Sequence, residues 1–315
     1  MNRAFRFPAW CSASALVVLG SAFLMLVGAG PALGQTEAKY VGSAACKDCH
    51  DKQVAQFDAG AHGRAEKDGA VVAKVVGCES CHGPASLHVA AGGNADDPGF
   101  KTVRNFKKFP ADKVLEICGS CHKGGDQFYA QHSVHTRNNV SCVDCHDIHH
   151  AKNEKTTRLL AADNTNALCL KCHTDKRAQI ARSAHMPVKE GGMTCADCHN
   201  PHGSPAPGML KAASGNDLCL SCHADKRGPF LWEHAPVREN CMSCHEPHGS
   251  SNPRMLNARQ PRLCQRCHIY NRHPSTLYDQ PELTSRSSRP INRACLNCHS
   301  MIHGSNHPSG KTFVK

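Results

Sequence analysis

Cysteine and histidine recur together at one spacing along this chain. The sequence has 21 cysteines, and twenty of them form pairs separated by two residues, with a histidine directly after each pair. Two thiols at this spacing can each bond one vinyl group of a haem, and the adjacent histidine then reaches the iron as an axial ligand. The motifs are Cys46-Cys49-His50, Cys78-Cys81-His82, Cys118-Cys121-His122, Cys142-Cys145-His146, Cys169-Cys172-His173, Cys195-Cys198-His199, Cys219-Cys222-His223, Cys241-Cys244-His245, Cys264-Cys267-His268 and Cys295-Cys298-His299. We therefore expect ten covalently bound c-type haems.

Structural zinc is the main alternative, because its sites also use cysteine pairs of this kind. Zinc does not require a histidine directly after the second cysteine of every pair, and a disulfide requires none. The remaining cysteine, Cys11, lies in the N-terminal segment 1–34, which we expect to be removed, so haem attachment accounts for every other cysteine. Covalent haem explains the pattern better than either alternative.

The N-terminus predicts export. Arg3 and Arg6 precede a nearly continuous apolar stretch over residues 13–30, and small residues then form a cleavage site before Gln35. This is the pattern of a secretory signal peptide, here residues 1–34. An uncleaved anchor is the alternative, because the apolar stretch is just long enough to span a bilayer. The small-residue site favours cleavage, which would leave residues 35–315 as the mature chain in the periplasm.

Histidines outside the motifs follow them at regular distances. Of the 23 histidines in the sequence, ten belong to the motifs. When the motifs are read in pairs, a further histidine follows the first motif of most pairs by about 12 residues and follows the second motif within a few residues. This phase selects ten candidates for the distal axial ligands: His62, His88, His135, His149, His185, His202, His234, His248, His273 and His303.

Some of these assignments leave alternatives. His150 competes with His149, His307 competes with His303, and His132 competes with His135.

Chain length limits which haem a distal histidine can reach. The Cα atoms of two trans axial histidines lie about 12–13 Å apart, given metal–nitrogen bonds near 2 Å. Three residues span at most about 10–11 Å. His149, His202 and His248 each follow a motif histidine by three residues, so each must serve a neighbouring haem. Ligation by two histidines lowers the potential and leaves no open coordination position, which argues against an enzyme.

The charge and composition fit this interpretation. Aromatic residues make up 5% of the chain, too few for a large apolar core of its own. The formal net charge is +11, which could indicate a nucleic-acid partner. The two propionates of each haem would offset it, so we expect no nucleic acid partner.

The paired motifs form an internal repeat. Segments CADCHNPHGSPAPGML from Cys195 and CMSCHEPHGSSNPRML from Cys241 are the clearest copies. They divide the chain into five two-haem units, at about 46–88, 118–150, 169–202, 219–248 and 264–307. Such repetition predicts a quasi-linear arrangement in which each unit contacts mainly its neighbours.

The fold class follows from these patterns. We expect a multihaem cytochrome c of short α-helices and irregular loops around a linear haem stack, with almost no β structure and an elongated form. Short helices are expected over Ala111–Cys118 and Thr174–Ser183. The Gly- and Ala-rich stretch 83–110 and the Ser-, Pro- and Arg-rich stretch 274–293 are expected to be loops.

These residues resemble a known family. The ten motifs, the two repeats quoted above, the opening YVGSAACKDCH and the ending CLNCHSMIHGSNHPSG are similar to the periplasmic decahaem cytochromes of outer-membrane porin–cytochrome conduits, of the MtrA/MtoA/DmsE type. The resemblance covers nearly the whole mature chain.

The resemblance implies a function and its partners. It implies a haem wire that inserts into an outer-membrane β-barrel porin and carries electrons between the periplasm and the cell exterior, for extracellular metal reduction or Fe(II) oxidation. Periplasmic or inner-membrane c-type cytochromes, and an outer-surface multihaem cytochrome, would be its redox partners. The alternative is a free periplasmic shuttle to a terminal reductase such as a DMSO-type reductase. The direction of electron flow stays open.

Overall fold

The computed structural model describes residues 37–71, 73–149, 158–268 and 294–314. Contacts divide the chain into two units, Met1–Glu37 and Ala38–Lys315. The signal peptide predicted over residues 1–34 lies outside the described residues, and every helix described below belongs to the second unit.

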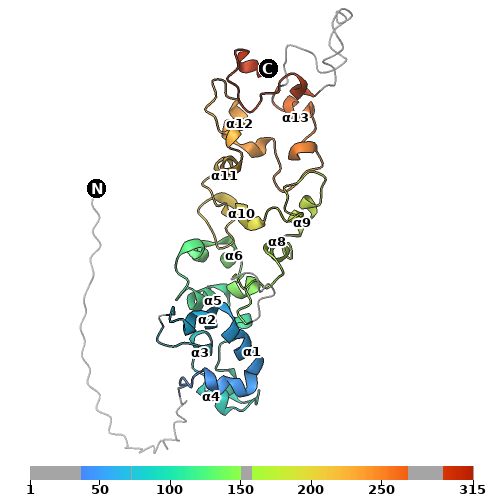
Figure 1. The fold of residues 1–315 in the computed structure, drawn as a ribbon. Helices are drawn as coiled ribbons and strands as arrows, with labels where there is room; N and C mark the ends of the chain where they lie inside the picture. Colours follow the sequence, from blue (N-terminus) through green and yellow to red (C-terminus); the bar gives the residue numbers. More distant parts are fainter. Residues whose placement is uncertain (1–36, 72, 150–157, 269–293, 315) are drawn as a thin grey trace, which may run out of the picture. The chain divides into compact units, whose positions relative to one another are not determined.

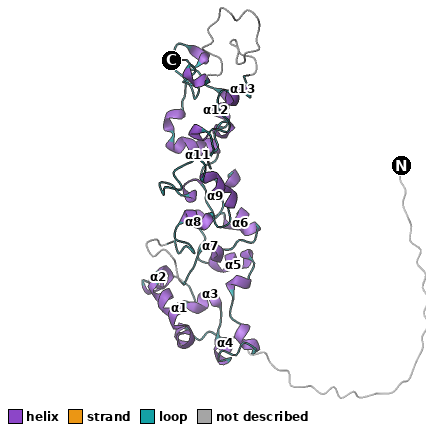
Figure 2. Ribbon diagram, turned by 90° about the vertical axis from the view of Figure 1, so that its right-hand side faces the viewer, coloured by secondary structure: helices purple, strands orange, loops and turns teal. Residues whose placement is uncertain are grey.

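The second unit consists of short helices joined by turns (Figures 1 and 2). Its α-helices in the described residues are α1 Lys47–Ala59, α2 Ala61–Lys67, α3 Cys78–His82, α4 Ser86–Ala90, α5 Ala111–Cys118, α6 Val134–Arg137, α7 Cys142–Cys145, α8 Thr165–Cys169, α9 Thr174–Ile180, α10 Cys195–Cys198, α11 Gly215–Cys222, α12 Ala235–Glu239 and α13 Arg262–Gln265.

Single turns of 3-10 helix connect them. These are η1 Ser43–Cys46, η2 Pro98–Lys101, η3 Phe106–Lys108, η4 Gly125–Gln127, η5 Ala130–His132, η6 Pro207–Met209, η7 Ala224–Lys226, η8 Cys241–Ser243, η9 Pro253–Met255, η11 Cys295–Asn297 and η12 Gly310–Thr312.

Within the second unit the helices from α8 to α13 follow one another in chain order (Figure 1). Figure 2 shows helices and loops alone over the described residues, without a strand. Isolated β-bridges occur instead, and three of them recur at the same place in successive repeats: His146 with Leu160, His199 with Leu210 and His245 with Leu256. The predicted short helices and irregular loops, with almost no β structure, are confirmed.

Local capping explains why so many motifs begin a helix. At α7 and α10, Ser141 with Asp144 and Thr194 with Asp197 form capping boxes, in which the side chain of each residue pairs with the backbone of the other. The first turn of the helix is thereby fixed on the segment that carries the two cysteines. The helices stay short because each turn leads directly into the motif histidine.

The apolar core is small. In the described residues, the buried apolar side chains are few and mostly short: Ala85, Ala111, Val114, Leu160, Ala162, Ile180 and Ala206. A chain of this length normally buries about three quarters of its unfolded surface. The side chains alone therefore cannot supply the core, and large covalently bound groups fit the space between the helices.

Two expectations from the sequence need correction. The stretch 83–110 is not a continuous loop, because it contains α4 and two 3-10 turns. Packing explains the difference: within α4, the ring of His88 lies 4.9 Å from the ring of Phe100 and its Nδ1 bonds the Phe100 carbonyl at 2.7 Å. The helix expected over 174–183 ends earlier, at Ile180. The helix expected over 111–118 is present, and 274–293 lies outside the described residues.

No helix in the described segments is long and apolar enough to cross a membrane.

Candidate haem sites

Each motif is folded as one helical turn. In eight of the ten motifs the histidine N–H donates to the carbonyl of the first cysteine, with N···O distances from 2.8 to 3.1 Å. This bond from residue i to residue i−4 brings the two thiols to one side of the turn and places the histidine at its end. The remaining motifs, at Cys46 and Cys78, lie in η1–α1 and α3. The two cysteines and the histidine of these eight motifs therefore share one helical turn.

Motif histidines face candidate distal histidines across a gap of constant width. Two metal–nitrogen bonds of about 2 Å, with half an imidazole ring on each side, would place two ring centres about 6 Å apart. The structure places eight pairs of rings 5.9 to 6.4 Å apart: His50 with His88, His62 with His122, His82 with His149, His135 with His173, His146 with His202, His199 with His248, His234 with His268 and His245 with His303. The side chains present fit an iron between each pair.

The pairing follows a rule that crosses between units. A histidine after the second motif faces the second motif histidine of the preceding unit, as His202 faces His146 and His248 faces His199. A histidine after the first motif faces the first motif histidine of the following unit, as His135 faces His173. The first unit has no predecessor, and there His88 faces His50 of its own unit.

Two candidates depart from this arrangement. The His185 Nε2 lies 3.0 Å from Glu190 Oε1, and its Nδ1 bonds the Arg182 carbonyl at 2.7 Å. The Glu190 hydrogen bond raises the pKa of His185. His273 lies outside the described residues.

The alternatives that the sequence left open differ in position. His149 faces His82, whereas His150 lies outside the described residues. His303 faces His245, whereas the Nδ1 of His307 accepts a bond from the Ser309 N–H at 3.1 Å. His135 faces His173, whereas His132 is exposed at the end of η5.

Backbone carbonyls fix the tautomer of the second-motif histidines. The Nδ1 atoms of His82, His146, His199, His245 and His299 lie 2.6 to 2.9 Å from the carbonyls of Arg104, Arg158, Gly208, Arg254 and Thr312. Because a carbonyl can accept but not donate, Nδ1 must carry the proton. The Nε2 lone pair is then available to a metal, which is the usual arrangement around a ligating histidine.

The recurring β-bridges explain where these carbonyls come from. After the second motif, the chain turns back and pairs beside the motif, as when Lys211 N–H donates to the Cys198 carbonyl at 3.0 Å and Asn257 N–H donates to the Cys244 carbonyl at 2.9 Å. The repeated sequence from Pro-His-Gly-Ser to Met-Leu is this returning loop. It serves to hold the motif histidine in place.

Burial keeps several distal histidines neutral. Desolvation is the largest cause that lowers the pKa of His62, His149, His202, His234, His248 and His303. A neutral imidazole retains the lone pair that a metal needs. The environment of these side chains therefore suits ligation.

The two motifs of each unit differ in exposure. The first motif histidines, His50, His122, His173, His223 and His268, are exposed, whereas the second motif histidines, His82, His146, His199, His245 and His299, are partly buried. The returning loop covers the second motif and has no counterpart at the first. Two classes of site alternate along the chain.

The thiols form one row in chain order. In each unit the first cysteines of the two motifs contact each other: Cys46 with Cys78, Cys118 with Cys142, Cys169 with Cys195, Cys219 with Cys241 and Cys264 with Cys295. The hydrogen bond with Cys142 and burial raise the pKa of Cys118, and burial with Cys78 raises that of Cys46 to about 11.

The row continues from unit to unit through the second motif of each. Cys81 acts electrostatically on Cys118, and Cys145 acts in the same way on Cys169. Cys198 and Cys244 repeat this relation with Cys219 and Cys264. Every attachment point therefore has the next one along the chain as its neighbour.

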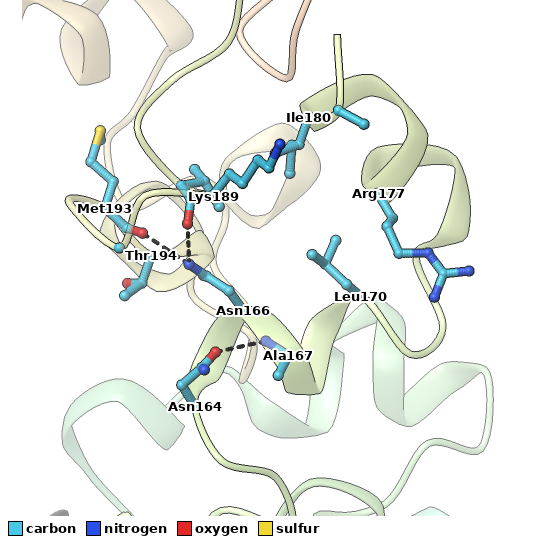
Figure 3. A pocket seen from close by; sticks show the side chains of 12 residues that line it. Asn164, Asn166, Ala167, Leu170, Arg177, Ile180, Lys189, Met193 and Thr194 are labelled. Carbon is cyan, nitrogen blue, oxygen red and sulfur yellow. Dashed lines mark hydrogen bonds between the residues drawn. The ribbon is translucent and has the colours of Figure 1, made fainter.

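An asparagine clamps the two motifs together in the third and fourth units. Asn166 in α8 donates from Nδ2 to the carbonyls of Val188 and Met193, at 3.1 and 2.9 Å, and its Oδ1 accepts from the Cys195 N–H (Figure 3). Asn216 repeats this pattern with Cys241. The sequence reasoning missed this device, although an asparagine three residues before the first cysteine of both motif pairs signalled it.

Asn166 also lines a cavity of about 530 Å³. Figure 3 shows the side chains around this cavity. Leu170, Ile180 and Met193 give it apolar walls, and Arg177 and Lys189 add positive charge. None of its lining residues is a cysteine or a histidine, so it is a space next to the attachment sites.

Comparison with known proteins agrees with this geometry. A family model described as a doubled CXXCH motif matches residues 132–178, 185–228 and 234–273. The chain is 42% identical over 280 residues to the multiheme cytochrome MtrA of Shewanella baltica (strain OS185), covering 87% of this chain and 81% of that protein. The motifs of this chain therefore hold covalently bound c-type haems, and the chain is an electron-transfer protein. The chain belongs to the MtrA family of multihaem c-type cytochromes.

Proposed function

We propose that this chain is a ten-haem wire that carries electrons between the periplasm and the cell exterior inside an outer-membrane β-barrel. The observation that carries the proposal is that facing histidine rings link every two successive units, as in His62 with His122, His146 with His202, His199 with His248 and His245 with His303. A row of haems held at these places suits transfer from one end to the other. When bound, each haem supplies a one-electron Fe(III)/Fe(II) couple.

The chain's residues hold each haem at three points and close its iron. Two cysteines would anchor each haem, the motif histidine would be one ligand of its iron, and a histidine from another segment would be the second. The crossing rule assigns His185 to the haem of His223. His273 is then left for the haem of His299, because no unit follows the last one. All ten irons are then six-coordinate, which leaves no position for a substrate and excludes catalysis at the iron.

The distal candidates are those of the sequence, His62, His88, His135, His149, His185, His202, His234, His248, His273 and His303. Where their Nδ1 atoms bond backbone carbonyls, as in His88, His135 and His234, the Nε2 lone pair would be free to bind the iron.

The partner is inferred from the family and from the surface. The relative is a multihaem cytochrome of the MtrA type. A chain rich in exposed charged side chains would need a polar lumen around it, which a barrel with a polar interior supplies. We propose a porin as this partner, with periplasmic or inner-membrane cytochromes at one end and an outer-surface multihaem cytochrome at the other. The location is the periplasm, in association with the outer membrane.

Reconstitution in proteoliposomes tests the electron transfer and the β-barrel partner together. Proteoliposomes that hold the barrel and the cytochrome, with reduced methyl viologen inside and an Fe(III) chelate outside, should show oxidation of the internal dye. Barrel alone should not. A matched variant, Cys169→Ser with Cys172→Ser, removes the haem in the middle of the row and should stop transfer while nine haems and binding to the barrel remain.

Two outcomes would contradict the proposal. If the cytochrome elutes alone from solubilised outer membranes and the barrel conducts without it, the free periplasmic shuttle replaces the conduit. If the nine-haem variant conducts at the normal rate, the row is not the electron path.

A further inference from the structure

In each of the five units, a side chain that precedes one haem motif accepts a backbone N–H from the segment of the other motif. The chain between the first cysteines of the two motifs differs in length between units, since it runs from Cys219 to Cys241 in the fourth and from Cys46 to Cys78 in the first. A connection of variable length cannot by itself hold two motifs at a fixed distance. The accepting side chains, called the bridging residues below, are Ser43, Asn139, Asn166, Asn216 and Gln260.

The third and fourth units make the same bond. Asn166 and Asn216 each lie three residues before the first cysteine of their unit. Their Oδ1 atoms accept the N–H of Cys195 at 2.9 Å and that of Cys241 at 2.8 Å. The helix of the first motif packs against the second motif in both units, α8 against α10 and α11 against η8. Each bond therefore ends on a cysteine that carries the second haem of the unit.

The first unit makes this connection with a serine. Ser43 lies three residues before Cys46, and its Oγ accepts the N–H of Cys78 at 3.0 Å. The second motif also reaches back, because Glu79 Oε2 accepts the N–H of Gly42 at 2.7 Å. Glu79 is buried. A different residue type thus joins the same two places as the asparagines do.

The second unit makes the connection in the opposite direction. Asn139 lies three residues before Cys142, the first cysteine of the second motif. Its Oδ1 accepts the N–H of Ala111 at 2.8 Å. Ala111 begins α5, which ends at Cys118 of the first motif and packs against α7 of the second. Here the second motif holds the helix that carries the first.

The fifth unit has the longest of these bonds. Gln260 lies four residues before Cys264, and its Oε1 accepts the N–H of Leu296 at 3.4 Å. Leu296 directly follows Cys295, the first cysteine of the second motif. The bond again joins the segments of the two motifs, although the residue type and its offset from the cysteine differ from those in the other units.

We propose that the bridging residues are positioning residues, which fix the two haems of each unit relative to each other and thereby set the electron step within the unit. A haem bonded to cysteine is only a few bonds from the backbone, so the backbone positions of the two motifs decide how far apart the two haems lie. Functional groups keep such a geometry when hydrogen bonds around them lock their supports. The inference rests on the haem attachment of the proposed function and is independent of the barrel and of the distal histidines.

A second asparagine in α8 separates positioning from stability. Asn164 caps this helix, and its Oδ1 accepts the N–H of Ala167 at 2.8 Å. This bond is of the same kind and length as the bond of Asn166 to Cys195, but it stays within one helix. Asn164→Ala is therefore the matched control for Asn166→Ala, because both remove a hydrogen bond from α8 and only one removes the link to the second motif.

Circular dichroism of the full ten-haem protein in the Soret region tests the proposal. Two haems that lie close together couple their Soret transitions, and the resulting couplet depends on their distance and mutual orientation. Asn166→Ala should change the couplet while intact mass still shows ten haems, and adding Asn216→Ala should about double the change, since distant sites act additively. Asn166→Asp, which keeps an oxygen for the Cys195 N–H, should retain the couplet. Asn164→Ala should lower the melting temperature and leave the couplet unchanged.

Asn139→Gly gives a second test that does not depend on a loss of stability. Asn139 has φ of +59°, so glycine removes the bond to Ala111 and relieves the left-handed backbone at the same time. The couplet should change although the backbone is less strained. An unaltered couplet in Asn166→Ala and Asn139→Gly, or an equal change in Asn164→Ala, would overturn the inference. Fewer than ten haems on the unmodified protein would instead contradict the ten-haem wire, and the comparison of variants would still decide on the bridging residues.

Discussion

Gly249 offers a direct way to disturb one histidine pair without touching a ligand. It follows His248 and has φ of +131°, a region that side chains other than glycine rarely adopt. A Cβ at this position would run into the Gln179 carbonyl and would lie 3.4 Å from the Cβ of His185. Both neighbours belong to the preceding unit, so an alanine would push the turn with His248 away from α9.

The cost of Gly249→Ala can be estimated from these two effects. Forcing an L-residue into a left-handed backbone costs about 1–2 kcal/mol, and overpacking a well-packed contact costs about 1–3 kcal/mol, which together give about 2–5 kcal/mol. The control is Gly191→Ala, since Gly191 also has positive φ, +78°, but has nothing within 4 Å of a Cβ. Gly191→Ala should therefore lower the free energy of unfolding only by the cost of backbone strain, about 1–2 kcal/mol.

The two variants should also differ in spectrum. If the turn moves, His248 withdraws from His199 and one haem in ten becomes high-spin in Gly249→Ala. Electron paramagnetic resonance would quantify that fraction, and thermal unfolding would give the loss of stability. Equal melting temperatures for the two variants, with every haem low-spin in both, would refute this account of the contact between units.

Further predictions follow from single contacts. Intact mass spectrometry should find ten haem masses on the mature chain; bound zinc would contradict the motif assignment. Glu79→Gln should cost about 1–3 kcal/mol and free the segment before the first motif to proteolysis, because the buried carboxylate accepts from three backbone N–H groups. Arg254→Gly should stabilise the protein by about 1 kcal/mol in thermal unfolding, since Arg254 has φ of +59° where the preceding repeat has Gly208. His202→Met should raise the potential of the haem of His146 in a redox titration and leave that of His199 unchanged.

The sequence allowed the attachment sites to be predicted because their chemistry is local. A Cys-x-x-Cys-His motif occupies one helical turn, so its spacing alone defines where the thiols and the imidazole stand. The phase of the other histidines pointed to ten distal candidates, and eight of these face a motif ring. The ligation itself stays a proposal. Chain length correctly placed His149, His202 and His248 away from the histidine of their own motif.

The partner of each distal histidine could not be predicted, because it depends on contacts between segments far apart in the sequence. His135, for example, bonds through Nδ1 to the carbonyl of Pro201, which belongs to the next unit. The helix α4 was missed for the same reason, since the Gly- and Ala-rich sequence around it has weak local preference and His88 gains its position from Phe100. Local propensity could not reveal either contact.

The crossing of the ligands explains why five similar units behave as one structure. In an array of repeats, stability is the sum of each unit and its contacts with the neighbours, and a weak unit can open alone. With the proposed ligation, most haems would be held by histidines of two successive units, so no unit could open without breaking ligands in another. The first and last units need a different distal ligation, because each has a neighbouring unit on one side only. His88 turns back to His50 at the first unit. The last unit has no successor either, so the proposed ligation gives the iron of His299 a ligand from its own unit, His273.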